Sequence, residues 1–197
     1  PGSSELVMPK WHGNEFLLAD GTRPTIRTFT PRFFDAGRLE LALDVVIHDG
    51  GAVSNWINDA ERGGAAAVSG PGRGYAVDDA APQFLLAGDE TAIPAICQLL
   101  EVLPESVPVE VIVEIADPFV RLDLHEGGAV NTQWVELPAG ASPGDALVDA
   151  IAAVELASGV KVWVAGEAGA MHRIRRHCFE ERGLPRSDVT VRGAWQA

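Results

Sequence analysis

The sequence predicts two folds in succession: part of an antiparallel β barrel over residues 1–80, and a Rossmann-like α/β domain with a parallel sheet over residues 81–197. Short alternating apolar stretches separated by Gly and Pro fill residues 26–75, which is typical of antiparallel strands. From Gln83 onward, strands of near-continuous Val, Ile and Leu alternate with helical stretches, which indicates a parallel sheet covered on both faces. The stretch DDAAP at residues 78–82 separates the two patterns.

The first part of the chain predicts few regular elements. Strands are expected at residues 26–30 (IRTFT) and 39–48 (LELALDVVIH), and a short helix at residues 54–62 (SNWINDAER). The stretch GPGRGY at residues 70–75 is interpreted as an interdomain turn, because it lacks the GxGxxG spacing and precedes no helix. So few strands cannot close a barrel, and the barrel is therefore expected to be incomplete.

The second part of the chain predicts a regular alternation of elements, with a loop-rich stretch at residues 117–142. Strands are expected at residues 84–88, 109–116, 160–166 and 189–195, and helices at residues 90–103, 143–157 and 168–183.

Composition and charge narrow the class of protein. Of the 197 residues, 47% are apolar and 22% charged, and no apolar run approaches the roughly 18 to 20 residues that span a bilayer. With no secretory leader and only two cysteines, we expect a cytoplasmic protein. The net charge of -13 opposes nucleic-acid binding. Basic residues do gather at residues 172–186, where a solvated helix face is favoured over an anion-binding patch.

The stretch RTFT is a candidate ligand-binding motif. In an extended strand Arg27 and Phe29 share one face, and Thr28 and Thr30 share the other. A guanidinium and an aromatic ring would thus project together, which suits a phosphate beside a flat ring system. The alternative is an edge-strand arginine with a core phenylalanine.

The stretch DVVIHDGGAVSNW contains a second candidate. Asp44, Val46 and His48 would lie on one face of a strand that ends at a Gly pair. Small residues at Gly51 and Ala52 would let backbone N–H groups approach a pyrophosphate at the helix start, with the Ser54 hydroxyl as a further donor. A plain turn with a helix N-cap explains the same sequence. A single histidine such as His48 is more often a hydrogen-bonded structural residue than a site residue.

Two strand-to-helix junctions follow in the α/β part. At the first, Asp89 and Glu90 occupy positions where a diphosphate needs bare N–H groups, although both residues suit the helix dipole. We interpret them as helix caps that oppose tight phosphate contact at this turn. The second junction is GEAGA at residues 166–170, with Glu167 at its helix start.

The chain lacks the usual motifs of hydrolysis and zinc chemistry. It holds no GxSxG elbow, no catalytic carboxylate pair and no metal-ligand spacing among its five His and two Cys. We therefore assign no catalytic side chain and no metal ligand. Cys178 lies in a basic helix that could lower its thiol pKa, but a buried inert cysteine is the favoured interpretation.

Taken together and in order, several motifs resemble the siderophore-interacting protein family of flavin-dependent ferric-siderophore reductases, from about Thr25 to the C-terminus. These motifs are RTFTPRFFD, DVVIHDGGAVSNW, VSGPGRGY, LLAGDETAIPAI, VWVAGEAGAMHRIRRH and ERGLPRSDVTVRGAW. The resemblance implies an FAD-binding barrel followed by an NAD(P)H-binding domain related to the ferredoxin-NADP reductase superfamily. It also implies that electrons pass from NADPH or NADH through FAD to a ferric siderophore, releasing Fe(II).

The resemblance also assigns the flavin residues. The family's Arg-x-Tyr-Thr motif falls on residues 27–30, which would place Arg27 at the FAD phosphate, Thr30 near the reactive flavin nitrogen and Phe29 against the ring or ribose. Phe29 replaces the usual Tyr. The stretch from Asp44 to His48 matches the flavin-side strand, and Gly51 to Ser54 match the pyrophosphate turn, with Ala52 where many relatives have Pro.

For the nicotinamide side, the resemblance points to the GDET turn with Asp89, where Thr91 would be the side-chain donor, and to Glu167. Trp195 matches an aromatic residue near the flavin. Glu114 would suit ribose hydroxyls and favour NADH, but Arg121 is close enough in sequence to reverse that preference. The choice of donor stays open.

The chain departs from the family at its start, where the barrel strands that relatives place before RTFT are largely missing, so it resembles a fragment. With Phe29, this keeps open a binding module that holds a siderophore or flavin without turnover. Because nothing in the sequence specifies the siderophore, a flavin reductase with another acceptor also remains open. The oligomeric state is not assigned.

Overall fold

The computed structural model describes residues 6–48, 50–70, 72, 74–124 and 129–197. By its internal contacts the chain forms two compact units. Unit 1 is Pro1–Phe29 with Val45–Tyr75, and unit 2 is Thr30–Asp44 with Ala76–Ala197. Antiparallel β structure in the first part and a parallel α/β sheet in the second agree with the predicted fold class.

Unit 1 contains a small antiparallel sheet and a short helix. Strands β1 (Lys10–Trp11) and β2 (Phe16–Leu17) pair, and the rings of Trp11 and Phe16 meet edge to face with centroids 5.0 Å apart. Helix α1 (Ala52–Asp59) begins two residues before the predicted start.

Strands β3 (Pro31–Asp35) and β4 (Glu40–Leu43) form an antiparallel hairpin within unit 2. The strand predicted at residues 26–30 is wrong, because the ladder begins at the Pro31–Leu43 pair, and the strand predicted at residues 39–48 is too long. Proline has no N–H to donate, so it typically stands at the first position of a strand. RTFT and the stretch from Asp44 to His48 therefore lie outside the ladder, and the shared faces predicted for their side chains stay a prediction.

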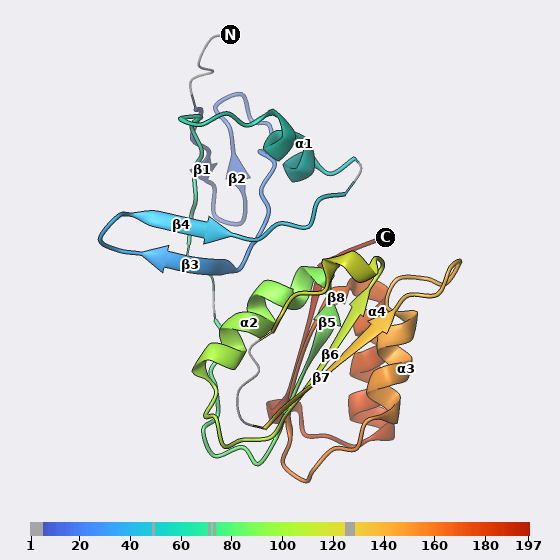
Figure 1. The fold of residues 1–197 in the computed structure, drawn as a ribbon. Helices are drawn as coiled ribbons and strands as arrows, with labels where there is room; N and C mark the ends of the chain where they lie inside the picture. The colour runs from blue at the N-terminus through green and yellow to red at the C-terminus, as the bar shows by residue number, and fades with distance from the viewer. Residues whose placement is uncertain (1–5, 49, 71, 73, 125–128) are drawn as a thin grey trace. The chain divides into compact units, whose positions relative to one another are not determined.

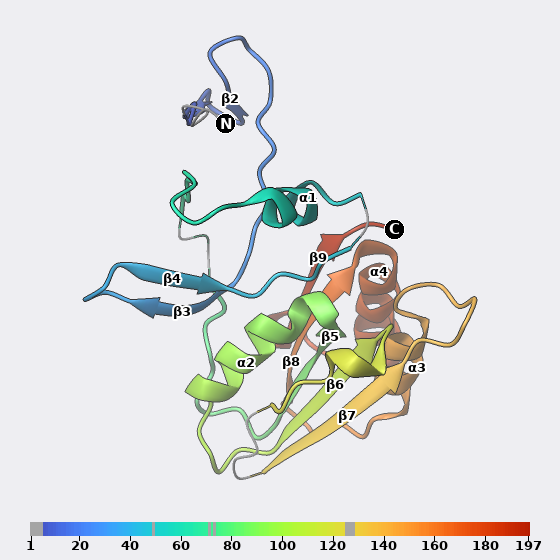
Figure 2. The same ribbon diagram turned by 45° about the horizontal axis from the view of Figure 1, so that its top comes forward.

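The hairpin packs on helix α2 (Ile93–Val102), as Figure 2 shows. Arg32 Nη1 donates to Glu101 Oε1 at 2.6 Å, and the Gln98 amide donates to the Pro31 carbonyl. The hydrogen bond to Glu101 raises the pKa of the Arg32 guanidinium. These contacts tie β3 to a helix more than 60 residues further along the chain.

We expect Arg32→Ala to loosen this hairpin without unfolding the sheet. The Arg32 and Glu101 side chains are 32% and 51% exposed, so the pair contributes about 0.5–1 kcal/mol. Hydrogen exchange of amides 32–43 should accelerate several-fold. Arg38→Ala is the matched control, because Arg38 lies 3.7 Å from Glu40 within the exposed tip of the hairpin. Equal acceleration in both variants would contradict the anchoring role of Arg32.

Five parallel strands form the central sheet of unit 2, in the order β7-β6-β5-β8-β9. Helix α2 covers one face of the sheet, and α3 (Asp145–Ala153) and α4 (Ala168–Arg176) cover the other (Figure 1). The strands are β5 (Phe84–Asp89), β6 (Val109–Ile115), β7 (Val130–Glu136), β8 (Lys161–Glu167) and β9 (Val189–Trp195). Three-residue 3₁₀ turns precede α2, follow β6 and precede β9, and a π-helical segment follows α4; these are η1 (Glu90–Ala92), η2 (Pro118–Val120), η4 (Arg186–Asp188) and η3 (His177–Glu181).

The core lies on both faces of this sheet. Strands β5, β6 and β8 are almost entirely buried, in agreement with their continuous apolar sequences. Leu85 and Ile112 pack with Leu147 of α3 and with Met171 and Ile174 of α4. None of the helices formed by the described residues has the length and apolarity needed to cross a bilayer.

Strand β7 was not predicted. Its sequence, VNTQWVE, lies in the stretch expected to be loop-rich, and its burial alternates along the strand. An edge strand is half exposed and keeps polar residues, so it lacks the continuous apolar run that identifies the central strands.

Candidate functional site

The order of the parallel strands reverses between β5 and β8, which are neighbours in the sheet although two strands separate them in sequence. In open α/β sheets, ligands bind outside the carboxyl ends of the strands at such a switch point. Here β5 ends at Asp89, β8 at Glu167 and β9 at Trp195. The fold therefore gathers residues that are distant in the sequence at one edge.

Asp89 is the centre of this group. Its Oδ1 accepts hydrogen bonds from Thr91 N at 2.9 Å and Thr91 Oγ1 at 2.5 Å. Its Oδ2 accepts from Glu167 N at 2.9 Å and from Trp195 Nε1 at 2.7 Å. The carboxylate of Asp89, a residue that is only 9% exposed, thus joins the predicted site residues. These are Asp89 itself, Thr91, Glu167 and Trp195. Asp89 also caps the 3₁₀ turn η1, as the sequence predicted for this junction.

Glu167 has a different role from Asp89. Its Oε2 accepts from Ala170 N at 2.8 Å, so the side chain caps α4. Hydrogen bonds from the backbone N–H groups of Gly169 and Ala170 hold the pKa of the Glu167 carboxyl below its usual value. The charged carboxylate is therefore the stable form at neutral pH, in a position where the helix dipole also favours it.

We expect the stability due to Glu167 to be lost in acid. Because its folded pKa is lowered, the contribution is complete above the unfolded pKa of about 4.3 and falls as the pH drops through the folded value. Glu167→Gln should cost about 1–2 kcal/mol in urea unfolding at pH 7. The difference in the free energy of unfolding between the unmodified chain and Glu167→Gln should become smaller below about pH 4.5. A gap that stays constant with pH would contradict this role.

Two other acidic residues at this edge are engaged by backbone groups. Glu90 Oε1 accepts from Ala116 N at 2.6 Å, which ties the turn after β5 to the end of β6. Glu114 is 4% exposed, and it accepts from Gly144 N at 2.6 Å and from Leu147 N at 2.9 Å. Both oxygens of Glu114 thus hold the start of α3, and its interpretation as a ribose ligand stays a prediction. Arg121 Nη2 pairs with Glu136 Oε1 at 2.6 Å.

Sequence reasoning missed the part that Gly88 and Gly166 play here. A Cβ built on Gly88 would lie 2.3 Å from the Ala165 carbonyl oxygen, and one on Gly166 would lie 2.6 Å from Asp89 Oδ2. Glycines at the ends of two adjacent strands are the signal that could have revealed this close approach.

The residues assigned to FAD lie before β3 and around the start of α1. Arg27 is exposed, donates to the Ile26 carbonyl and makes no ion pair within the described residues. Thr28 is exposed, whereas Phe29 and Thr30 are partly buried. Asp44, at the other end of the hairpin, lies 3.9 Å from Arg32 Nε.

The start of α1 has its first backbone N–H groups beside a closely packed glycine. A Cβ built on Gly51 would lie 2.7 Å from the His48 ring and 2.9 Å from Ser54 Oγ, so glycine lets these two side chains lie against the backbone. Ser54 is 3% exposed and accepts from His48 N at 3.1 Å. No side chain among the described residues caps this helix, so its first N–H groups suit a phosphate oxygen. Val46 is exposed beside this turn, and Ala52 begins the helix. Asp49 and part of GPGRGY, Pro71 and Arg73, lie outside the described residues.

The basic segment after β8 is partly used for structure. Arg173 pairs with Asp145 at 2.6 Å, and Arg182 donates to two backbone carbonyls. Further residues line an open groove of about 480 Å³, namely His172, Arg175, Arg176, Phe179, Glu180, Leu184 and Arg186. Burial raises the pKa of the Cys178 thiol, which agrees with an inert core cysteine.

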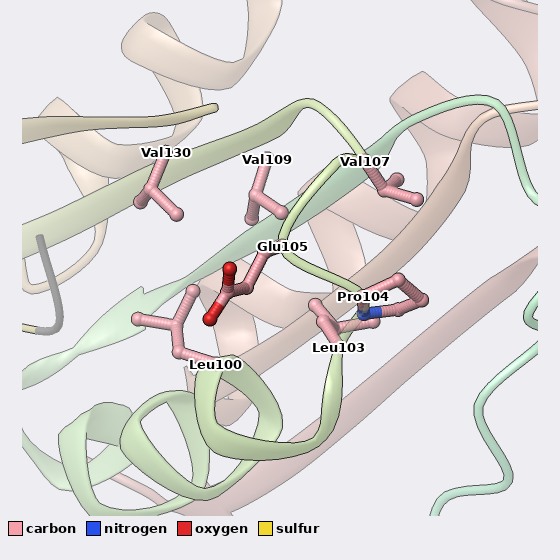
Figure 3. Close-up of a pocket in the computed structure, with 7 residues that line it drawn as sticks. All are labelled: Leu100, Leu103, Pro104, Glu105, Val107, Val109 and Val130. Atoms are coloured by element: carbon pink, nitrogen blue, oxygen red, sulfur yellow. The ribbon is translucent and has the colours of Figure 1, made fainter. Parts of the chain in front are cut away.

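A small cavity lies beneath the end of α2, lined by Leu100, Glu105, Val109 and Val130 among others (Figure 3). Its volume of about 10 Å³ is the size of a single water molecule, so it cannot hold a cofactor.

Comparison with known proteins gives consistent results for both parts of the chain. Residues 81–197 match the family model described as siderophore-interacting protein, and residues 3–75 match the siderophore-interacting FAD-binding domain. An uncharacterized protein of Mycobacterium tuberculosis is 37% identical over 191 residues, which cover 91% of this chain and 68% of that protein. The NADPH-dependent ferric-chelate reductase of Escherichia coli is 29% identical over 199 residues, covering 98% of this chain and 75% of the reductase. The crystal structure of the siderophore-interacting protein SipS from Aeromonas hydrophila superposes with a TM-score of 0.77 at 30% identity, covering 97% and 82% of the two chains.

Proposed function

Because the chain belongs to the siderophore-interacting protein family, we propose that it is a reductase that passes electrons from NADPH or NADH through FAD to a ferric siderophore. One observation carries the proposal. An FAD-binding domain match precedes an α/β sheet whose switch-point edge gathers Asp89, Thr91, Glu167 and Trp195. We propose that the boundary between the FAD-binding and NAD(P)H-binding domains lies near residue 80.

We propose that FAD is held by the residues that the family motif matches. Arg27 would bind a phosphate, since no acidic partner in the described part of the chain competes for its guanidinium. Phe29 and Thr30 would contact the flavin, with Asp44, Val46 and His48 beside it. The backbone from Gly51 to Ser54 would receive the pyrophosphate at the start of α1. When bound, FAD supplies the step from two-electron to one-electron chemistry, which no side chain provides.

We propose that the nicotinamide binds at the switch-point edge of unit 2. The Thr91 hydroxyl donates its hydrogen bond to Asp89 Oδ1, so the lone pairs of the hydroxyl oxygen remain to accept a hydrogen bond from the nicotinamide carboxamide. Thr91 thus acts as an acceptor rather than the donor suggested by sequence. Trp195, 38% exposed, offers a ring surface at the same edge. Acidic caps at Asp89 and Glu167 disfavour a phosphate in direct contact with these turns.

A ferric siderophore is the proposed electron acceptor. The family and the name of the Escherichia coli relative, a ferric-chelate reductase, support this substrate class. Reduction releases the metal because hard oxygen ligands hold Fe(III) much more tightly than Fe(II). The residues need only orient and bind, which agrees with the absence of catalytic motifs from the sequence.

Titration of the purified chain with FAD, followed by anaerobic NADPH or NADH, tests the function. We expect a saturable flavin absorption spectrum that bleaches with one of the two donors. Ferrous iron should then appear in a chelator assay when a ferric siderophore is added. A saturable spectrum that never bleaches would favour the binding-module function, and bleaching without ferrous iron would favour a flavin reductase with another acceptor.

We expect Arg27→Ala to weaken FAD binding about 10- to 100-fold, because a hydrogen bond to a charged group contributes about 1.5–3 kcal/mol. Arg23→Ala is the matched control. Arg23 lies in the same segment but pairs with Glu15 at 2.5 Å, and its loss should leave FAD affinity unchanged. Equal affinities of the two variants, measured by the same absorption titration, would exclude Arg27 as the phosphate ligand.

A further inference from the structure

The carboxylate of Asp89 is saturated by the protein itself. It receives four hydrogen bonds, two at each oxygen, from Thr91, Glu167 and Trp195. An ionised carboxylate has about four acceptor positions, so none remains for a ligand. Asp89 is also 9% exposed. The sequence suggested this residue as a cofactor ligand, whereas its hydrogen bonds give it another use.

We propose that Asp89 is the positioning residue of the electron-transfer site, which fixes the orientation of the Trp195 indole and of the backbone that enters α4. This inference rests on the proposed function, because Trp195 is taken there as a ring that packs at the cofactor site. The bond from Trp195 Nε1 to Asp89 Oδ2, 2.7 Å long, joins the end of β9 to the end of β5 across 106 residues. Because the indole is held at Nε1, the plane of the Trp195 ring keeps a fixed orientation relative to the end of β5.

The local backbone makes room for this arrangement. Gly166 has a φ of +157°, and a Cβ built on it would lie 2.6 Å from Asp89 Oδ2. Glycine at this position therefore lets the carboxylate reach Glu167 N and Trp195 Nε1 together. A second carboxylate holds the neighbouring turn, because Glu167 Oε2 bonds Ala170 N.

The acceptor at position 89 must be an aspartate rather than an asparagine. The backbone N–H groups of Thr91 and Glu167 face opposite oxygens of the side chain, and an asparagine would turn its NH₂ group toward one of them. Trp195 would then keep a neutral acceptor at best, which holds the indole less strongly than a charged one.

The first measurement needs no flavin. In the full-length chain labelled with ¹⁵N, the indole N–H resonance that disappears in Trp195→Phe identifies Trp195. Asp89→Asn is expected to move this resonance upfield, because the charged acceptor is lost. Gly166→Ala retains the carboxylate but crowds it, and it should move the same resonance in the same direction. The control is Asp117→Asn, since Asp117 caps the turn after β6 through Phe119 N and does not contact Trp195. An unchanged Trp195 resonance in Asp89→Asn and Gly166→Ala would overturn the proposal, whatever the kinetics show.

The second measurement is a double-mutant cycle on the rate of flavin bleaching by saturating NADPH or NADH. Asp89→Asn is expected to slow bleaching about tenfold in the unmodified chain, and less than about threefold in Trp195→Phe, where the indole N–H is already absent. Equal losses in both backgrounds would overturn the positioning role. If FAD bound to the unmodified chain is never bleached by NADPH or NADH, the proposed reductase function fails. The Trp195 resonance still tests the positioning role of Asp89 in that case, so the two failures can be told apart.

Discussion

Glu114→Ala is expected to lower the free energy of unfolding by about 4 kcal/mol. The side chain is 4% exposed and accepts from two backbone N–H groups, Gly144 N at 2.6 Å and Leu147 N at 2.9 Å. A hydrogen bond to a charged group contributes about 1.5–3 kcal/mol, and a buried donor without a partner costs about 1–3 kcal/mol. The substitution leaves both donors buried, at the point where α3 starts against the sheet.

The control for this prediction lies on the same strand. Glu110 Oε2 accepts from the Asn131 side chain at 2.7 Å, but this contact is exposed. Glu110→Ala should therefore cost less than about 1 kcal/mol. Urea unfolding followed by circular dichroism measures both variants. If Glu114→Ala costs no more than Glu110→Ala, then the carboxylate does not anchor α3.

Gly88→Ala is expected to cost about 3 kcal/mol or more and to abolish nicotinamide-dependent bleaching. Its Cβ would lie 2.3 Å from the Ala165 carbonyl oxygen and 2.3 Å from Ala92 Cβ. Both neighbours belong to packed backbone elements, β8 and η1, so relief requires strands to move apart. The displaced strands are the two that end at the switch point, so the gathered site residues move with them.

Gly193→Ala on the outer strand β9 is the matched control. Its Cβ would lie 3.5 Å from Ala168, which is ordinary van der Waals contact, and the change should stay within about 0.5 kcal/mol. Thermal unfolding compares the two variants, and an anaerobic titration with NADPH or NADH reports on the site. A Gly88→Ala chain that remains as stable and as active as Gly193→Ala would contradict the close packing of β5 against β8.

The central elements were predictable because their sequences are locally consistent. Strands β5, β6 and β8 have apolar runs that only a sheet covered on both faces can bury, and the helices between them begin near the predicted residues. Strand β7 was missed because its polar residues resemble a loop. The strand at RTFT was placed too early, because the pairing that decides its start involves Leu43, which lies outside that stretch.

By itself, the sequence determined the order of the two folds, the buried strands and the motifs that identify the family. Each of these depends on residues that are near one another in the chain, through propensity, periodicity and spacing. Only the tertiary structure decided how the acidic side chains are used. Asp89 bonds Glu167 N and Trp195, 78 and 106 residues away, and Glu114 bonds backbone groups 30 and 33 residues away. A carboxylate is available to a ligand only if no protein donor has taken its oxygens, and those donors reach it through the folding of the sheet.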